Sequence, residues 1–375
     1  MKTILMGGRV LLEGKFYDNC PILWEDGIIL AVGEACGETV ADRVIDAKGL
    51  TVLPGLVDVH THGRAGYDFN TATEEQMVRM KRDYAAHGVT TVFATLASDT
   101  AEGWRRSISN IQESGYDGLH FEGRYLNPGK RGAHAAELLV PLDAAELETF
   151  LRDIAIPCHI SAAYELDTDG SFSEVAKRYG ATMGLGHTMA TAEQARTAIA
   201  RGAVSFTHLF NAMPALHHRE GGAVSVALCG GGFGELICDG MHVCPDMVAL
   251  AYRCLGNDKT VLITDSMEAT GCPDGEYAIA GQPVVVKNGK ALTLDGALAG
   301  STLDLWDGVK NLMRFAGLSL EQAVVCATCN PARMVGLDGK VGSIAVSKRA
   351  DLIAIDAQAL TIEGVIANGE AVRGF

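Results

Sequence analysis

The chain has 375 residues, of which 48% are hydrophobic and 21% charged, which excludes a disordered chain and provides enough apolar material for a large core. With 31 basic and 46 acidic residues its net charge is −15, so we expect no general affinity for nucleic acid or an anionic membrane. At about 150 residues per domain the length predicts two to three domains, although one α/β barrel takes about 250 residues alone.

The first fifty or so residues have the pattern of short strands separated by turns: Ile4–Leu12, Pro21–Trp24, Ile28–Val32 and Arg43–Asp46. The extreme N-terminus has a single lysine before a glycine pair, so we expect a strand there and not a signal peptide. No segment reaches the roughly 18 consecutive apolar residues of a membrane span. Ten scattered cysteines in so long a chain favour a reducing compartment, and we expect a cytoplasmic protein.

After Pro54 and Gly55 the pattern changes to short apolar runs that alternate with helix-like segments. Such alternation is typical of buried parallel strands with crossover helices, and eight units predict a (β/α)₈ barrel of the TIM type. An open doubly wound sheet is the alternative, but no GxGxxG follows the first run. The eight runs are Leu56–His60, Val89–Leu96, Leu119–Glu122, Ile156–Tyr164, Ala181–His187, Ala203–His208, Glu235–Cys238 and Thr260–Thr264.

The tail returns to short strands, at Val341–Ile344, Leu352–Asp356, Ile362–Ala367 and near Val372. Both chain ends are therefore β-rich, with the predicted barrel between them. The sequence predicts an α/β protein in which residues 1–53 and 341–375 form one small β-sandwich domain and residues 54–340 form the barrel.

Histidines and carboxylates gather where the predicted barrel strands end. His60 and His62, at positions i and i+2, share one face of the first run. Because the carboxyl ends of barrel strands meet at one face, we expect all six candidates to lie together. The other four are Glu122, His187, His208 and Asp265.

Imidazole and carboxylate donors without a thiolate fit Zn²⁺, Fe²⁺, Mn²⁺ or Co²⁺. Six ligands are too many for one tetrahedral ion and fit two ions that share a carboxylate and a water, which predicts hydrolysis of an amide, an ester or a cyclic amide. His120 shares the face of Glu122, either as an outer group of the site or packed against it. We expect structural roles for His159 and His87.

Several stretches resemble known families. Pro54–His62 is similar to the opening barrel strand of the amidohydrolase superfamily. The other stretches resemble motifs of the N-acetylglucosamine-6-phosphate deacetylases, and the set runs from about residue 54 to 351 in the order of that family. They are His120–His134, Gly186–Thr191, Thr207–Pro214, Cys238–His242, Thr264–Met267, Leu298–Leu303 and Asn330–Arg333.

The resemblance implies roles for individual residues. Glu122, His187 and His208 resemble the metal triad of the family, and the glutamate there, in place of a carboxylated lysine, is typical of it. Some members lack the first-strand histidines and hold one metal. Since this chain keeps His60 and His62, the resemblance implies one or two divalent ions per subunit, with zinc or iron ahead of manganese and cobalt.

The resemblance also implies a reaction, the hydrolysis of N-acetyl-D-glucosamine 6-phosphate to D-glucosamine 6-phosphate and acetate. Asp265 resembles the general base and acid, which takes a proton from a metal-activated water and gives it to the departing amine. His242 resembles the residue that hydrogen-bonds the acetyl carbonyl, and His134 a contact to a sugar hydroxyl. Asn211 and the backbone N–H of Ala212 resemble a phosphate cradle.

Arg219 resembles an arginine that reaches the phosphate from the neighbouring subunit, which implies a homodimer with shared sites. Arg124, where the family usually has proline, and Trp306 depart from the pattern. They either line the pocket and alter sugar preference or are loop variation without effect.

Three alternative functions stay open. A deacetylase of N-acetylgalactosamine 6-phosphate differs by the epimer at one hydroxyl, which the sequence does not separate. A hydrolase of cyclic amides is opposed by the missing carboxylatable lysine and by the stretch around Asn211. A catalytically inactive scaffold is opposed by the complete set of six predicted ligands.

Overall fold

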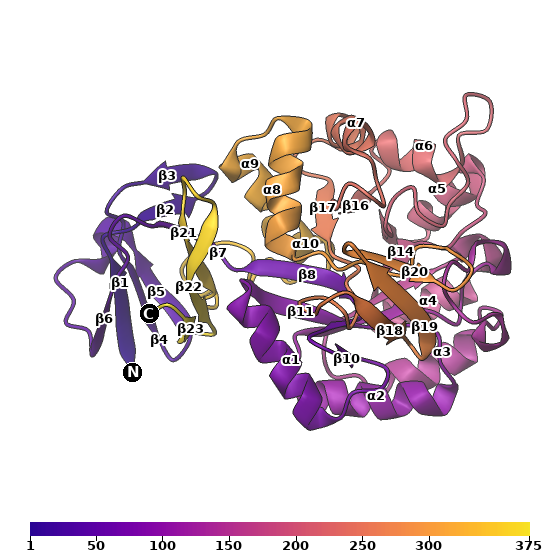
Figure 1. Cartoon of the computed structure of the whole chain (residues 1–375), viewed down its shortest axis with the longest axis horizontal. Helices are drawn as coiled ribbons and strands as arrows, with labels where there is room; N and C mark the ends of the chain where they lie inside the picture. The colour runs from indigo at the N-terminus through magenta and orange to yellow at the C-terminus, as the bar shows by residue number, and fades with distance from the viewer.

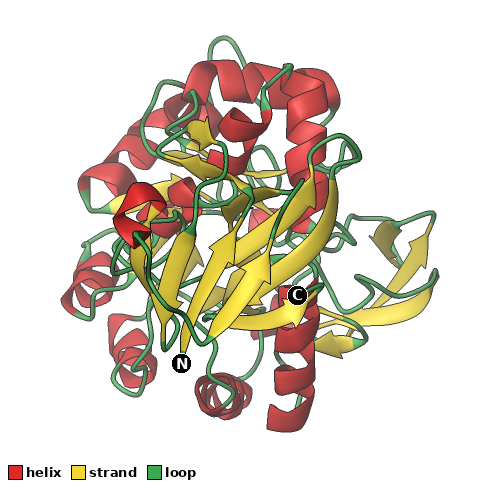
Figure 2. Ribbon diagram, turned by 90° about the vertical axis from the view of Figure 1, so that its left-hand side faces the viewer, coloured by secondary structure: helices red, strands yellow, loops and turns green.

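The computed structural model describes the whole chain, Met1–Phe375. A barrel of parallel strands ringed by helices forms the larger part, and a smaller all-β unit that holds both termini lies beside it (Figure 1). Figure 2, seen from the side of the all-β unit, shows its strands in front of the helices of the barrel. The two parts correspond to the fold class that the sequence predicted.

The barrel sheet has eight strands, which pair in sequence order and run parallel to one another. The first and last strands also meet, because the N–H of Asp265 donates to the carbonyl of His60 at 2.9 Å and the N–H of His62 donates to that of Ser266 at 2.7 Å. All eight predicted runs are confirmed as strands. They are β8 (Leu56–Thr61), β11 (Val89–Leu96), β12 (Gly118–Glu122), β13 (Cys158–Ala162), β14 (Thr182–Leu185), β15 (Ala203–Phe206), β16 (Phe233–Ile237) and β17 (Thr260–Ile263).

Helices cover the outside of this barrel. In α2 the buried residues Trp104, Ile108 and Ile111 follow the i, i+4, i+7 spacing of one helix face. Capping boxes begin α1 at Thr73 and α5 at Thr191. The helices are α1 (Glu74–Ala86), α2 (Ala101–Glu113), α3 (Ala144–Leu151), α4 (Ser171–Arg178), α5 (Ala192–Ala200), α6 (Gly222–Leu228), α7 (Pro245–Leu255), α8 (Leu305–Ala316), α9 (Leu320–Val325) and α10 (Cys329–Met334), with short 3₁₀ turns η1 (Gly33–Cys36), η2 (Pro128–Lys130), η3 (Ala136–Leu138) and η4 (Tyr164–Leu166).

Two sheets built from both chain ends form the β-sandwich. Between them lies a small core to which Leu5 and Trp24 contribute from one sheet, and Val52 and Leu352 from the other. The predicted boundaries, 1–53 with 341–375, stay a prediction. The first sheet has the order β5 (Ile28–Val32), β4 (Ile22–Glu25), β1 (Lys2–Met6), β6 (Arg43–Asp46), and the second β23 (Glu370–Arg373), β22 (Thr361–Ala367), β21 (Leu352–Asp356), β7 (Thr51–Pro54), β2 (Arg9–Leu12), β3 (Lys15–Tyr17).

The second sheet has its other face against the barrel. Along β21, Leu352 points into the sandwich core while Ile353 joins the barrel core, so the strand is apolar from Leu352 to Ile355. From β7 the chain passes through Gly55 into β8, and a Cβ at Gly55 would lie 2.2 Å from the hydroxyl of Thr90. Only glycine fits this direct link between the two parts.

Two predictions about the chain ends were wrong in detail. Ile4–Leu12 is not one strand: it divides at Gly7 and Gly8 into β1 and β2, which belong to different sheets. The predicted strand Val341–Ile344 is irregular backbone. Gly342 has φ of +82° and packs against the carbonyl of Thr328, which takes this segment out of the extended conformation.

A small antiparallel sheet follows β17 and was not predicted. Its strands are β18 (Gly275–Ile279), β19 (Gln282–Lys287) and β20 (Lys290–Thr293). Two-residue turns join them, at Ala280–Gly281 and Asn288–Gly289, and all four turn residues have positive φ. In Figure 1, β18 and β19 lie across the front of the barrel, near the two-residue strand β10 (Tyr67–Asp68), which pairs with β9 (Gly63–Arg64).

None of the helices combines the length and the apolar composition needed to cross a lipid bilayer.

Candidate active site

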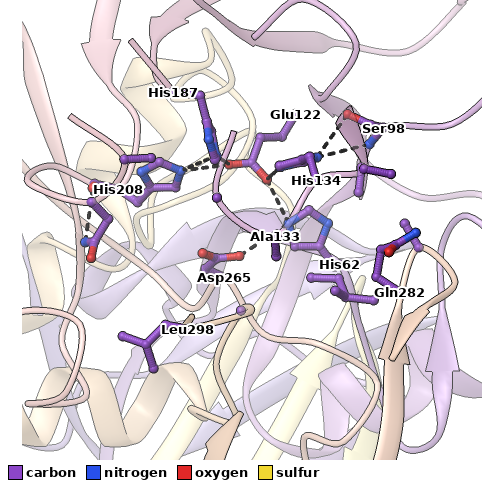
Figure 3. Close-up of a pocket in the computed structure, with 18 of the residues that line it drawn as sticks. His62, Ser98, Glu122, Ala133, His134, His187, His208, Asp265, Gln282 and Leu298 are labelled. Carbon is purple, nitrogen blue, oxygen red and sulfur yellow. Dashed lines mark hydrogen bonds and ion pairs between the residues drawn. The ribbon is translucent and has the colours of Figure 1, made fainter. Parts of the chain in front are cut away.

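The six predicted metal ligands meet at one end of the barrel, and Figure 3 shows five of them: His62, Glu122, His187, His208 and Asp265. Each lies in a strand or within two residues of its carboxyl end: His60 and His62 at β8, Glu122 at β12, His187 at β14, His208 at β15 and Asp265 at β17. Since the strands are parallel, their carboxyl ends face the same way, which is why residues so far apart in the chain converge.

Glu122 is the centre of this cluster. Its Oε1 lies 3.1 Å from Nε2 of His187 and 2.8 Å from Nε2 of His208. Its Oε2 lies 3.0 Å from Nε2 of His62 and 3.4 Å from Nε2 of His60. One buried carboxylate therefore joins two sets of donors, one on each oxygen.

Asp265 completes the second set. Its Oδ1 lies 3.3 Å from Nε2 of His62 and 3.5 Å from Nε2 of His60. The cluster therefore contains two groups of residues that could each hold a metal ion. One consists of His60, His62, Glu122 and Asp265, and the other of Glu122, His187 and His208.

Three of these residues have a left-handed backbone. The φ angles are +46° at His187, +31° at His208 and +49° at Asp265. Such a conformation costs a residue other than glycine on the order of 1–3 kcal/mol and persists where the surrounding structure enforces it. Here it occurs two residues past a strand end, at positions whose side chains turn into the cluster.

The electrostatics of the cluster favour a cation. Burial alone raises the pKa of Glu122, but the neighbouring imidazoles, His60 first among them, lower it well below its usual range. Burial lowers the pKa of His62, yet hydrogen bonds to Asp265 and Glu122 raise it to about 9. Carboxylates that hold a proton on a buried imidazole create a field in which a metal cation can replace that proton.

The other set of donors includes a neutral ring. Burial lowers the pKa of His187 to about 4, so its imidazole carries no charge near neutral pH. A metal-binding histidine has to be neutral at the nitrogen that binds. The pKa of His187 thus suits the metal-ligand role that the sequence predicted.

The geometry also fits a divalent ion. Nε2 of His60 is buried without a hydrogen-bond partner. Nε2 of His187 lies only 3.1 Å from Nε2 of His208. Ligand atoms about 2.0–2.1 Å from a tetrahedral ion are about 3.3 Å apart, so this spacing is that of two nitrogens on one ion. Nitrogen and oxygen donors without sulfur fit zinc and the iron-group ions.

Two further histidines lie beside the cluster. Nδ1 of His134 contacts the hydroxyl of Ser98 at 3.0 Å, and its Nε2 lies 3.7 Å from Oε2 of Glu122. His242 contacts Oδ2 of Asp239 through Nδ1 at 2.7 Å. Asp239 also accepts the backbone N–H of His242 at 2.8 Å, so it fixes both the loop and the ring.

A pocket opens above the cluster. Its walls include His134, Asn211, Ala212 and His242, which the sequence analysis assigned to substrate binding. A free volume of about 160 Å³, roughly that of five water molecules, leaves room for a small organic group beside an ion.

The turn between β18 and β19 forms another wall of this pocket. Ile279, Ala280 and Gln282 line it, and the N–H of Ala280 donates to Oδ2 of the buried Asp68 at 3.0 Å. The chain segment after β17 thus returns over the end of the barrel and is attached to it beside the site.

Three residues singled out from the sequence lie outside the pocket. Arg124 points away from it and donates to Glu146 and to the carbonyl of Asp99, both at 2.6 Å. Trp306 is buried in α8 and donates to the carbonyl of Leu360. Neither lines the pocket, so the interpretation in which they do is wrong. Arg219 is exposed on the loop before α6, where it contacts Nε2 of His218 at 2.8 Å.

Sequence reasoning missed three residues near the site. Glu235 lies in the middle of β16 and is fully buried. Asp239 belongs to a motif that was recognised, and its spacing of three residues from His242 was the available signal. Gln282 could have been found through Asn288–Gly289, a dipeptide typical of hairpin turns, which marks the small sheet. His120 and His159 are buried in the barrel below the cluster.

Comparisons with known proteins agree with this geometry. Residues 51–372 match the amidohydrolase family model. The chain is 34% identical to an N-acetylglucosamine-6-phosphate deacetylase of Vibrio furnissii, over 96% of this chain and 93% of that protein. It is 33% identical to an N-acetylgalactosamine-6-phosphate deacetylase of Escherichia coli O157:H7, over 98% of this chain and 100% of that protein.

Solved structures give the same result. One is a substituted form of N-acetyl-D-glucosamine-6-phosphate deacetylase from Mycobacterium smegmatis in complex with N-acetyl-D-glucosamine-6-phosphate, with a TM-score of 0.90, 32% identity and 99% of both chains covered. Another is N-acetylglucosamine-6-phosphate deacetylase from Pasteurella multocida, with a TM-score of 0.92, 27% identity and 99% of both chains covered.

Proposed function

This chain belongs to the amidohydrolase family, and from that premise we propose that it hydrolyses N-acetyl-D-glucosamine 6-phosphate to D-glucosamine 6-phosphate and acetate. One observation carries the proposal: a buried cluster of metal-binding groups forms the floor of a pocket, in a chain whose relatives with that activity in their names match it over nearly its full length. The enzyme is thus a hydrolase that acts on a linear amide bond.

A divalent metal fits the two donor groups that share Glu122. The first ion would be held by Glu122, His187 and His208, and a second by His60, His62 and Asp265 together with Glu122. A metal bound there supplies Lewis-acid polarisation of the amide carbonyl and lowers the pKa of water. We propose one or two ions per subunit, zinc or iron ahead of manganese and cobalt.

Asp265 is the proposed general base and acid. Burial raises its pKa, but the charge of His60 and the hydrogen bond from His62 lower it, so the carboxylate is ionised and can accept a proton. The attacking water adds to the acetamide carbon and gives its proton to Asp265. Asp265 returns that proton to the nitrogen as the C–N bond breaks, which releases acetate and the free amine.

His242 is proposed to stabilise the oxygen on which charge develops. Its ring lines the pocket and donates Nδ1–H to Asp239, and in the doubly protonated ring that this carboxylate stabilises, Nε2–H would donate to the acetyl carbonyl. A donor fixed in place before the reaction needs no reorganisation in the transition state.

The remaining pocket residues are proposed to bind the sugar phosphate. His134 would contact a hydroxyl, while Asn211 and the N–H of Ala212 would cradle the phosphate. The exposed position of Arg219, outside the pocket of its own chain, supports a role in the site of a neighbouring subunit and therefore a homodimer. A cytoplasmic location, where ten unpaired cysteines stay reduced, is part of the same proposal.

Acetate release tests the function. The zinc- or iron-loaded protein is mixed with N-acetylglucosamine 6-phosphate, with the unphosphorylated sugar and with the galactosamine epimer, in parallel. We expect turnover of the phosphorylated glucosamine derivative and little turnover of the free sugar. No turnover of either phosphorylated epimer by metal-loaded protein would contradict the proposal.

The galactosamine epimer is the second candidate. This chain matches the N-acetylgalactosamine-6-phosphate deacetylase of Escherichia coli O157:H7 over the whole length of that protein, at an identity close to that of the Vibrio furnissii relative. Turnover of this epimer alone would identify N-acetylgalactosamine 6-phosphate as the substrate. Hydantoin and dihydroorotate serve as controls for hydrolysis of cyclic amides, and we expect no reaction with either.

A further inference from the structure

Glu235 lies where a carboxylate is costly. It is in the middle of β16, its side chain points into the barrel, and it is 0% exposed. Neither carboxylate oxygen has a hydrogen-bond partner. An unpaired buried carboxylate costs several kcal/mol, so its presence calls for a group that compensates it.

Two imidazoles face this carboxylate. Nε2 of His159 lies 3.5 Å from Oε1, and Nδ1 of His60 lies 3.9 Å from Oε2. Both histidines are completely buried, and neither of these two nitrogens has another partner. Glu235 is thus the acceptor available to both.

His60 connects Glu235 to the metal-binding cluster. Its Nε2 lies 3.4 Å from Glu122 and 3.5 Å from Asp265, while its Nδ1 faces Glu235. One nitrogen of the ring is therefore directed at the metal-binding cluster and the other at Glu235. This is the order carboxylate, histidine, metal site, in which the outer carboxylate fixes the ring of a ligand.

The ring of His60 has little freedom to turn. The ring of His120 packs edge-on against it, with centroids 4.4 Å apart. His120 is itself held by Ser161 at 2.7 Å and by Thr95 at 3.1 Å. A shortening by about 1 Å of the distance between Nδ1 of His60 and Oε2 of Glu235 would bring the two atoms into hydrogen-bond range.

The tautomer of His60 follows from this arrangement. A nitrogen that binds a metal uses its lone pair, so the proton of a neutral ring lies on the other nitrogen. For Nε2 to face the cluster as a ligand, Nδ1 has to carry that proton, and a buried N–H needs an acceptor.

We propose that Glu235 is a positioning residue for the metal site: it keeps the proton of His60 on Nδ1 and thereby directs Nε2 to a divalent ion shared with His62 and Asp265. The inference rests on the proposed function only in requiring a metal at His60, not in the identity of the substrate.

Metal binding by Glu235→Gln tests the proposal. The variant keeps the size of the side chain and removes its charge. Zinc content after reconstitution is measured by mass spectrometry, and zinc affinity by competition with a chelator. Loss of an outer carboxylate typically lowers metal affinity about 10–100-fold. We expect that loss for one ion only, with the ion at Glu122, His187 and His208 retained, as in His60→Asn.

Glu146→Gln is the matched control. Glu146 is a half-buried carboxylate of the same barrel that pairs with Arg124 and Tyr125, outside the pocket. We expect the control to keep the zinc content and affinity of the unsubstituted protein. This comparison separates the effect of Glu235 on the site from the loss of any barrel carboxylate.

Two results would overturn the inference. One is a folded Glu235→Gln protein with unchanged zinc content and affinity. The other is an unsubstituted protein that binds a single ion, unaffected by His60→Asn. If Glu235→Gln does not fold, nitrogen NMR of the zinc-loaded protein with labelled histidines is the deciding measurement. We expect a proton on Nδ1 of His60, whose signal is assigned by its loss in His60→Asn. A proton on Nε2 would refute the inference. None of these measurements uses turnover, so they are independent of the substrate test.

Discussion

The carboxylate of Glu122 is the single group that both proposed metal positions share. Its Oε1 faces His187 and His208, and its Oε2 faces His62 and His60. A change at this position therefore affects both sets of donors, whereas a change at any one imidazole affects one.

Glu122→Gln should abolish metal binding and activity together. The amide keeps the shape of the side chain but cannot offer two anionic oxygens. We expect kcat to fall at least about 10³-fold, beyond the 10–100-fold typical of an outer partner. Zinc content and acetate release are measured on the same sample. Retention of both metal and activity would contradict the assignment of Glu122.

Among individual residues, the sequence predicted those site residues that lie at strand ends. His187 and Asp265 each follow an apolar run, so the barrel topology alone brings them together. Glu235 lies within such a run, and nothing local indicates that its side chain points inward beneath His60. That relation depends on how neighbouring strands are staggered, which sequence patterns do not determine.

Among the elements beside the site, the turn at Ala280–Gly281 forms a wall of the pocket. It belongs to an antiparallel sheet that extends from the barrel, yet its residues line the pocket. Its attachment is a hydrogen bond from the N–H of Ala280 to the buried carboxylate of Asp68, close in sequence to His62. This charge-assisted contact acts at the turn itself, while Ile279 and Val284 pack against Met267 and Ala299 farther along the sheet.

Asp68→Ala should loosen that wall. A hydrogen bond to a charged group contributes about 1.5–3 kcal/mol, so we expect KM to rise about 10-fold, with a smaller change in kcat because the wall touches substrate and not the reacting bond. Steady-state kinetics measure both constants.

Asp274→Ala is the control for this change. Asp274 caps the other turn of the same sheet through the N–H of Asn288 at 2.6 Å, in an exposed position that does not line the pocket. Equal KM values for the two variants would show that Asp68 has no special role.

The elements that the sequence predicted well are those with both faces covered. The run Val89–Leu96 is buried throughout and was predicted as β11 to the residue. Val341–Ile344 has apolar side chains at its two ends, and they divide between two cores: Val341 packs beneath the barrel and Ile344 in the sandwich. Apolar residues alone do not distinguish a strand from a segment that fills a junction.

For the whole molecule, Arg349 connects the two parts. Its guanidinium pairs with Asp117 of the barrel and with Asp351 beside β21, and it donates to the carbonyl of Thr90 at 2.9 Å. The side chain is 22% exposed, while Asp351 is 4% exposed. Removal of the cation would leave two carboxylates together in the junction.

Arg349→Met should lower the free energy of unfolding by about 2–3 kcal/mol, less than the 3–5 kcal/mol of a completely buried pair. Urea denaturation measures the change. Arg79→Met, which removes an exposed pair with Glu75 on α1, is the control and should change stability by no more than about 0.5 kcal/mol. Equal losses in the two variants would contradict the role of Arg349 as a connection.

The proposed dimer makes a prediction at the same scale. Arg219→Ala and Asp265→Asn should each be inactive or nearly so. If Arg219 serves the neighbouring subunit, a mixed dimer has one complete site, and random reassociation of equal amounts restores roughly a quarter of the unsubstituted activity. If the activity of the mixture does not exceed the summed activities of the two separate variants, Arg219 serves the site of its own subunit or no site.

The pairing of β7 with β21 has a consequence for how the protein is made. Pro54 lies opposite Leu352, about 300 residues later in the chain. At about 5–20 residues per second, a ribosome takes on the order of 15–60 s to supply that partner. During this time the edge of β7 that later pairs with β21 is open, whereas β8, which continues from β7 and carries His60, pairs with β11 and does not depend on that partner. The strand that leads into the metal site, β7, therefore gains its last partner only when residues 352–356 have emerged.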